Sequence, residues 1–192
     1  MKKLLLIFAL LPAFCIAQQK DCEYTYTQSN DGVQLRWTKD YLMYEKVFGG
    51  NSQYVFFSLT SSDGIPVLNF QLLSKSPEFP KVQCTDATSK LYIQLMNGRI
   101  ITLIPASQDS CANLIYDKEN KLNIRVLSTP FLFTKGSMED LEVSPISFIR
   151  VKYATETIDY SVKKELKSET LGGTYNPEQF FISQLKCLKA EK

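Results

Sequence analysis

The residues that commonly carry chemistry are sparse in this 192-residue chain, which contains no histidine. Its absence removes the commonest general base and both the Ser-His-Asp and Cys-His nucleophile arrangements. A hydrolase that uses two carboxylates across a cleft remains an alternative. The spacing singles out no such pair, and we interpret the clustered acids as solvated surface charges: Glu139, Asp140, Glu142, Glu165 and Glu169. We therefore expect no catalytic residue and a protein that is not an enzyme.

The cysteines predict disulfides rather than a metal site. Cys15 lies in an apolar N-terminal stretch that we expect to be removed as a signal peptide. Four cysteines then remain: Cys22, Cys84, Cys111 and Cys187. An even number of cysteines in an exported chain is typical of disulfide bonds. We favour Cys84–Cys111 because these residues flank a central hairpin, which leaves Cys22–Cys187, and the other two pairings stay open. Without histidine or a CxxC motif, we expect no metal and no cofactor.

Aromatic residues are the most informative candidates for a binding surface. The first quarter of the chain contains Tyr24, Tyr26, Trp37 and Tyr41. Tryptophan and tyrosine combine a large ring with a polar tip, which suits ligand and partner surfaces. The alternative is that these rings fill the core and its rim, as they do in many β-sandwiches.

Residues 1–17 are predicted to form a signal peptide. Two lysines precede the apolar segment Leu4–Ile16, which is short for a membrane-spanning helix. Small residues near Ala17 predict cleavage after that residue, and residues 18–192 then form a single β-rich domain. The expected location is the periplasm or the exterior of the cell.

Two other interpretations of the N-terminus are less favourable. An uncleaved anchor would need a longer apolar stretch. A lipoprotein would use Cys15 as its lipid-bearing residue, but Phe14 stands where a small residue is expected.

The charge pattern excludes other partner classes. The chain has 22 basic and 20 acidic residues, and loss of the two N-terminal lysines makes these numbers equal. No long run of one charge occurs, so we expect no nucleic-acid partner. No other apolar stretch is long enough to cross a bilayer, so we expect no stable membrane insertion after signal cleavage.

The central element predicted from the pattern is a β-hairpin over residues 91–104. Asn97-Gly98 between two apolar runs suits a two-residue type I′ turn. Met96 would then lie opposite Arg99. That register predicts one nearly apolar face, which must be covered by another layer: Leu91, Ile93, Leu95, Ile100, Thr102 and Ile104.

The other elements are mostly strands connected by short turns. Residues 41–48 fit a helix or a strand, and we prefer the strand because aromatic and β-branched residues surround it. A short helix should begin at Ser137 with Asp140 completing a capping box, and a C-terminal helix should begin at Asn176. The predicted fold is an antiparallel β-sandwich or open barrel with a short helix and a C-terminal helix packed on it.

Three segments carry a resemblance to a known group of proteins. They are SKLYIQLMNGRIITLI at residues 89–104, the stretch from STPFLF to SVKKE at 128–165, and YNPEQFFISQLKC at 175–187. Together they resemble uncharacterised small exported proteins of Bacteroidetes-type bacteria, a group with no assigned activity. The resemblance implies export and one domain, and it carries over no catalytic residue.

These observations predict an exported, non-catalytic domain that binds a protein partner in the periplasm or outside the cell. The alternative is a small-molecule or glycan-binding module that uses the N-terminal aromatic residues.

Overall fold

The protein is built almost entirely of antiparallel β-strands. The computed structural model describes residues 22–30, 33–62, 65–107 and 109–189, and the predicted signal peptide lies outside these ranges. The strands are β1 (Tyr24–Asn30), β2 (Val33–Thr38), β3 (Tyr41–Phe48), β4 (Asn51–Ser62), β5 (Ile65–Ser76), β6 (Cys84–Thr85), β7 (Lys90–Leu95), β8 (Ile100–Pro105), β9 (Ser110–Cys111), β10 (Asn113–Asp117), β11 (Leu122–Phe133), β12 (Ile146–Lys152), β13 (Thr157–Ser161), β14 (Leu166–Lys167) and β15 (Thr174–Tyr175). The helices are α1 (Met138–Val143), the 3₁₀ helix η1 (Pro177–Gln179) and α2 (Phe180–Lys189).

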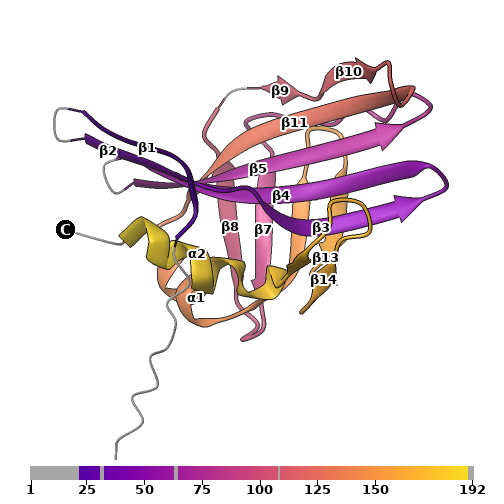
Figure 1. Cartoon of the computed structure of the whole chain (residues 1–192). Coiled ribbons are helices and arrows are strands. Elements are labelled where there is room, and N and C mark those ends of the chain that lie inside the picture. Colours follow the sequence, from indigo (N-terminus) through magenta and orange to yellow (C-terminus); the bar gives the residue numbers. More distant parts are fainter. Residues whose placement is uncertain (1–21, 31–32, 63–64, 108, 190–192) are drawn as a thin grey trace, which may run out of the picture.

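Eleven strands form one curved sheet. Its order is β1-β2-β4-β5-β11-β8-β7-β12-β13, with β3 added to β4 and β10 added to β11. The strands β3, β4, β5 and β11 cross the steeply inclined strands β7, β8 and β13 (Figure 1). The predicted antiparallel fold with two helices is confirmed, and the sheet stays open instead of closing into a barrel.

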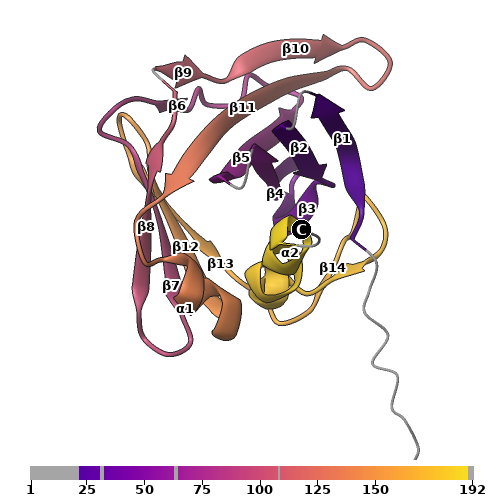
Figure 2. The ribbon, with the colours of Figure 1, turned by 90° about the vertical axis from the view of Figure 1, so that its left-hand side faces the viewer.

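The main core lies on the concave side of the sheet, where both helices contribute to it. Leu141 of α1 is fully buried there, as are Phe180 and Leu185 of α2. The ring of Phe180 lies 5.6 Å from that of Phe57 on β4. Figure 2 shows the sheet curling around the two helices, which occupy its open side. The predicted C-terminal helix therefore covers the apolar face that the sheet leaves open.

The central hairpin has a different register from the predicted one. Leu91 pairs with Leu103 and Ile93 pairs with Ile101. The Leu95 N–H donates to the Arg99 carbonyl at 2.9 Å, so the loop contains three residues rather than two. Gly98 ends this loop with a φ of 84°, a left-handed conformation that suits glycine in a three-residue hairpin loop. The predicted pairing of Met96 with Arg99 is therefore wrong.

The extra loop residue reverses the faces of β8. Side chains alternate along a strand, so a shift of one residue exchanges the inner and outer sets. Ile101 and Leu103 are buried, whereas Ile100 is 63% exposed and Ile104 is 38% exposed. The prediction is correct for β7, where Leu91, Ile93 and Leu95 are buried, and wrong for β8.

Both predicted helix caps are also wrong in detail. Ser137 makes no side-chain cap, because its hydroxyl donates to the Thr134 carbonyl at 2.6 Å. Asn176 makes none either, and its backbone N–H donates to the Tyr41 hydroxyl at 2.7 Å. The helices nevertheless begin close to the predicted residues, because Pro177 and the apolar spacing set their positions.

The charged segment after β13 is tied to the edge strand β3. The Glu45 carboxylate accepts hydrogen bonds from the Ser168 hydroxyl at 3.1 Å and from the Thr170 hydroxyl at 2.7 Å. Leu166 of β14 is buried in a second, small cluster with Leu42 and Tyr54. The β14–β15 pair therefore covers part of β3, which pairs with only one neighbour among the described strands.

Two buried tyrosines form a polar pair inside the main core. The hydroxyl groups of Tyr153 and Tyr160 lie 2.7 Å apart, and each residue is 1% exposed. Burial raises the pKa of both phenols well above the usual value of about 10. A raised pKa means that the folded state holds the phenol protons more tightly than the unfolded chain does. The resulting stability is complete below pH ~10 and is lost as the pH rises further.

We therefore expect the free energy of unfolding to fall as the pH rises from about 10 to about 12. Urea denaturation across this range would measure the decline. The double variant Tyr153→Phe/Tyr160→Phe removes both titrating groups and should decline less steeply. Equal slopes for the variant and the wild type would contradict this role of the pair.

Candidate functional site

Two of the four candidate aromatic residues lie together on the outer surface of the sheet. Tyr26 of β1 is paired in register with Trp37 of β2, so the two side chains share a face. Trp37 in turn pairs with Thr60 of β4, two residues from Ser58. The exposed fractions are 45% for Tyr26 and 41% for Trp37. Both rings are therefore held on a sheet and remain accessible.

The Trp37 indole is fixed in orientation by a hydrogen bond. Its Nε1–H donates to the Ser58 hydroxyl at 3.1 Å. The ring lines a hollow of about 330 Å³, together with Asp40 and the outer surface of β5 and β11. An anchored and partly exposed ring above a hollow can stack on a ligand without first becoming ordered.

Polar side chains from neighbouring strands form the floor of the hollow. Asn69 lies opposite Ser58 in the β4–β5 pair, and Gln71 lies opposite Ser128 in the β5–β11 pair. The Asn69 amide donates to the Thr60 hydroxyl at 2.6 Å, and the Gln71 amide donates to the Ser128 hydroxyl at 3.4 Å. Each amide has two N–H groups and an oxygen, so both keep capacity for a ligand. We call this surface the Trp37 face and define it as Tyr26, Trp37, Ser58, Asn69, Gln71 and Ser128.

Charge is nearly absent from this hollow. Among its described lining residues, Asp40 is the one charged side chain. A single carboxylate can accept hydrogen bonds from a ligand, whereas hydrolysis of a glycosidic bond uses two. Across the described parts of the chain, no group of three or more potential metal ligands comes together. The geometry suits recognition of a neutral or cationic polar molecule.

Tyr24 and Tyr41, the other two candidates, lie next to the C-terminal helix. The Tyr24 hydroxyl donates to the Cys187 carbonyl at 2.7 Å. The ring of Tyr41 lies 5.6 Å from Phe180, and burial raises the pKa of its phenol. Both side chains are half-buried. Their contacts attach β1 and β3 to α2, so the four aromatic residues do not form one surface.

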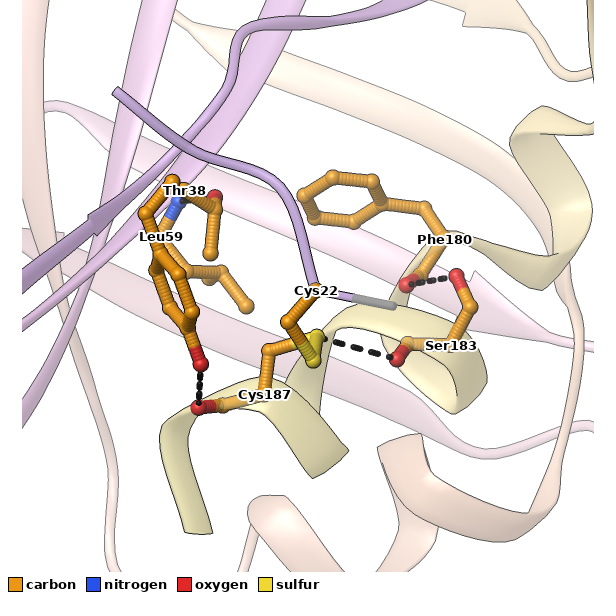
Figure 3. The surroundings of a disulfide bond; sticks show 7 residues. Cys22, Thr38, Leu59, Phe180, Ser183 and Cys187 are labelled. Carbon is orange, nitrogen blue, oxygen red and sulfur yellow. Dashed lines mark hydrogen bonds between the residues drawn. A yellow bond between two sulfur atoms is a disulfide. The ribbon is translucent and has the colours of Figure 1, made fainter. Parts of the chain in front are cut away.

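The disulfides follow the pairing favoured from the sequence. Cys22 is bonded to Cys187, and Cys84 is bonded to Cys111. Figure 3 shows the first bond joining the segment before β1 to α2, close to Phe180 and Ser183. Two disulfides support an oxidising location outside the cytoplasm.

Sequence reasoning missed the polar members of the Trp37 face. Ser58, Asn69, Gln71 and Ser128 come from three strands, and cross-strand register brings them together. One usable signal existed on β5, where Asn69 and Gln71 alternate with Leu68, Phe70 and Leu72. These outward amides belong to the ordinary polar–apolar alternation of a half-exposed strand, and their partners depend on pairing that the sequence does not show.

Comparison with known proteins adds no further identification. No family model, curated protein or solved structure matches the chain. The resemblance to small exported proteins therefore stays a prediction. In the described residues, no helix is both long enough and apolar enough to span a membrane.

The Cys22–Cys187 bond should contribute much to the stability of the whole domain. It closes a loop with a sequence separation of 165 residues, which strongly restricts the unfolded chain. We expect the double variant Cys22→Ser/Cys187→Ser to lose about 2–5 kcal/mol in the free energy of unfolding, measured by urea denaturation.

The matched control is Cys84→Ser/Cys111→Ser, whose sequence separation is 27 residues. The loop-entropy account gives this shorter loop a smaller loss. An unchanged midpoint for the Cys22/Cys187 variant would contradict the importance of that bond.

Proposed function

We propose that this protein is an exported, non-catalytic binding module whose ligand is a neutral oligosaccharide held at the Trp37 face. The observation that carries the proposal is the anchored and exposed Trp37 ring above a hollow lined by Asn69 and Gln71. A sugar presents C–H groups to an aromatic ring and hydroxyl groups to amides and carboxylates. The hollow beside Trp37 offers each of these partners, with Asn69 and Gln71 as the amides and Asp40 as the carboxylate.

The charge of the hollow supports a neutral ligand. Asp40 would repel an anionic sugar, and no described lysine or arginine lines the hollow to compensate. The same carboxylate is a strong acceptor for sugar hydroxyl groups. A volume of about 330 Å³ is at the lower end of the range for ligand sites. We therefore infer that the hollow holds one short part of the oligosaccharide and that Tyr26 contacts the sugar next to it.

The proposed setting is the periplasm or the exterior of the cell, with cleavage of the signal peptide after Ala17. The support is the pair of disulfides, which persist in oxidising compartments. Polysaccharides are abundant in these compartments, so the proposed ligand and the proposed location agree.

Trp37 is the only tryptophan in the sequence, so its intrinsic fluorescence reports directly on this site. We expect a neutral oligosaccharide from a panel of hexose and amino-sugar oligomers to shift this emission. Calorimetry should show that Trp37→Ala weakens binding by about tenfold or more, and Trp37→Phe by less. Gln71→Ala should weaken binding several-fold by removing a hydrogen-bonding partner.

The matched control is Tyr116→Ala on β10, which removes another exposed aromatic ring at 54% exposure. It should leave the affinity unchanged. Circular dichroism and the urea midpoint would verify that each variant is folded. Absence of binding across the panel would overturn the proposal, as would equal affinity for the wild type and Trp37→Ala.

A second candidate function, binding of a protein partner, is supported by the edge strand β10. Its residues Leu114, Ile115 and Tyr116 are 44–54% exposed on both faces. Among the described strands, only β11 pairs with it. An exposed apolar edge favours addition of an extended strand from another chain.

For this candidate, we expect Ile115→Lys to abolish partner capture, because a lysine on an edge strand disfavours strand addition. The measurement is a quantitative pull-down from envelope fractions with wild type, Ile115→Lys and the turn variant Lys118→Gln. Sedimentation of the purified protein would show whether β10 pairs with a second copy instead. A missing specific partner, or equal recovery with all three proteins, would contradict strand addition at β10.

A further inference from the structure

A second outer surface differs sharply from the Trp37 face in its chemistry. It covers β7, β12 and the start of β8, with Lys90 and Lys152 at one end and Ile100 and Phe148 at the other, and we call it the basic–apolar face. Within it lies a hollow of about 590 Å³, between Lys152 and Ile100. This volume is within the range of small-molecule sites.

The cationic end contains an unfavourable pair of like charges. Lys90 lies directly opposite Lys152 in the β7–β12 ladder. Neither ammonium group has an ion-pair partner within the described ranges. Like charges at opposed positions of a sheet destabilise it. An anion placed between these ammonium groups would relieve the repulsion.

The next pair along the strands adds an oriented guanidinium group. Arg150 lies opposite Tyr92, and its Nε and Nη2 donate to the two oxygens of Asp159 at 2.6 and 2.8 Å. Asp159 therefore fixes the guanidinium, which lies 5.8 Å from the centre of the Phe148 ring. The Nη1–H groups remain available for a ligand.

The far end of the face is apolar. Gln94 pairs with Phe148, and Ile100 follows on β8 with 63% of its surface exposed. Met96, just after β7, is 60% exposed. Ile100 is exposed because the three-residue loop between β7 and β8 turns its side chain outward. The cationic end at Lys90 and the apolar end at Gln94 are four residue steps apart along β7, a distance of about 13 Å.

We propose that the basic–apolar face binds an anionic amphiphile. The head group lies between Lys90 and Lys152, and the chain extends past Tyr92 and Phe148 towards Ile100. The separation of charge from apolar surface along the strand favours this ligand over an acidic sugar, whose charges and C–H faces alternate at short intervals. This inference is independent of oligosaccharide binding, because it uses other residues. The basic–apolar face favours an anionic ligand, whereas the Trp37 face disfavours one.

The direct test is calorimetric titration of the folded protein with dodecanoate below its micelle concentration. We expect saturable binding that Lys152→Glu weakens by about tenfold or more, because a carboxylate replaces one cation of the head-group site. The same substitution places an opposite charge across from Lys90, so the thermal midpoint should rise. Binding and stability thus change in opposite directions, which a purely structural role of Lys152 does not produce.

The matched control is Lys186→Glu, which makes the same charge change at an exposed position on α2 and should leave dodecanoate affinity unchanged. Ile100→Ser tests the apolar end and should weaken dodecanoate several-fold without loss of a buried side chain. Octaethylene glycol monododecyl ether has an alkyl chain of similar length with an uncharged head group that is not a sugar, and it should bind more weakly than dodecanoate. The Trp37 emission should stay constant during the dodecanoate titration.

Four results would overturn the proposal. The first is the absence of dodecanoate binding, and the second is equal binding of dodecanoate and octaethylene glycol monododecyl ether. The third is binding of a hexuronate oligomer in preference to dodecanoate. The fourth is binding to vesicles of anionic phospholipid without binding of the free amphiphile, which would indicate a membrane surface instead.

Discussion

A curved sheet that does not close must have its concave side covered by another part of the chain. Here α2 supplies most of that cover, through Phe180 and Leu185, and α1 contributes Leu141. The helix is attached to the first strand by the Cys22–Cys187 bond and by the hydrogen bond from Tyr24 to the Cys187 carbonyl. The outer surfaces can present ligand-binding groups because this inner contact supplies the burial that stabilises the sheet.

The two outer surfaces show how one sheet can carry two chemistries. Side chains alternate along each strand, so the inward positions supply the core and the outward ones are free to differ. On β5 the outward residues at the hollow are the amides Asn69 and Gln71, beside the single tryptophan. On β7 and β12 they include aromatic rings and lysines that have no ion-pair partner among the residues that the structure describes. One hollow carries a lone carboxylate and the other carries cations, so the two should select ligands of different charge.

The sequence predicted the elements better than it predicted how they pair. Alternating apolar residues identified most of the strands, and the apolar spacing identified α2. Asn97-Gly98 identified the turn, but the same dipeptide fits loops of two or three residues. The difference of one residue in loop length decides whether Ile100 or Ile101 points into the core. Of the candidate site, the sequence supplied Tyr26 and Trp37. The polar partner Ser58 lies 21 residues from Trp37, and Ser128 lies 57 residues from Gln71, so only strand pairing brings them together.

The bond between Cys22 and Cys187 also constrains the order in which parts of the protein can fold. It joins the segment before β1 to the last helix, and 165 residues separate its two ends. During synthesis the N-terminal strands emerge long before the residues that cover their core. The first hairpin must therefore wait, with Cys22 reduced or paired elsewhere, until α2 is available. This bond can form only after α2 has been made, and until then the apolar residues that α2 covers stay open to aggregation.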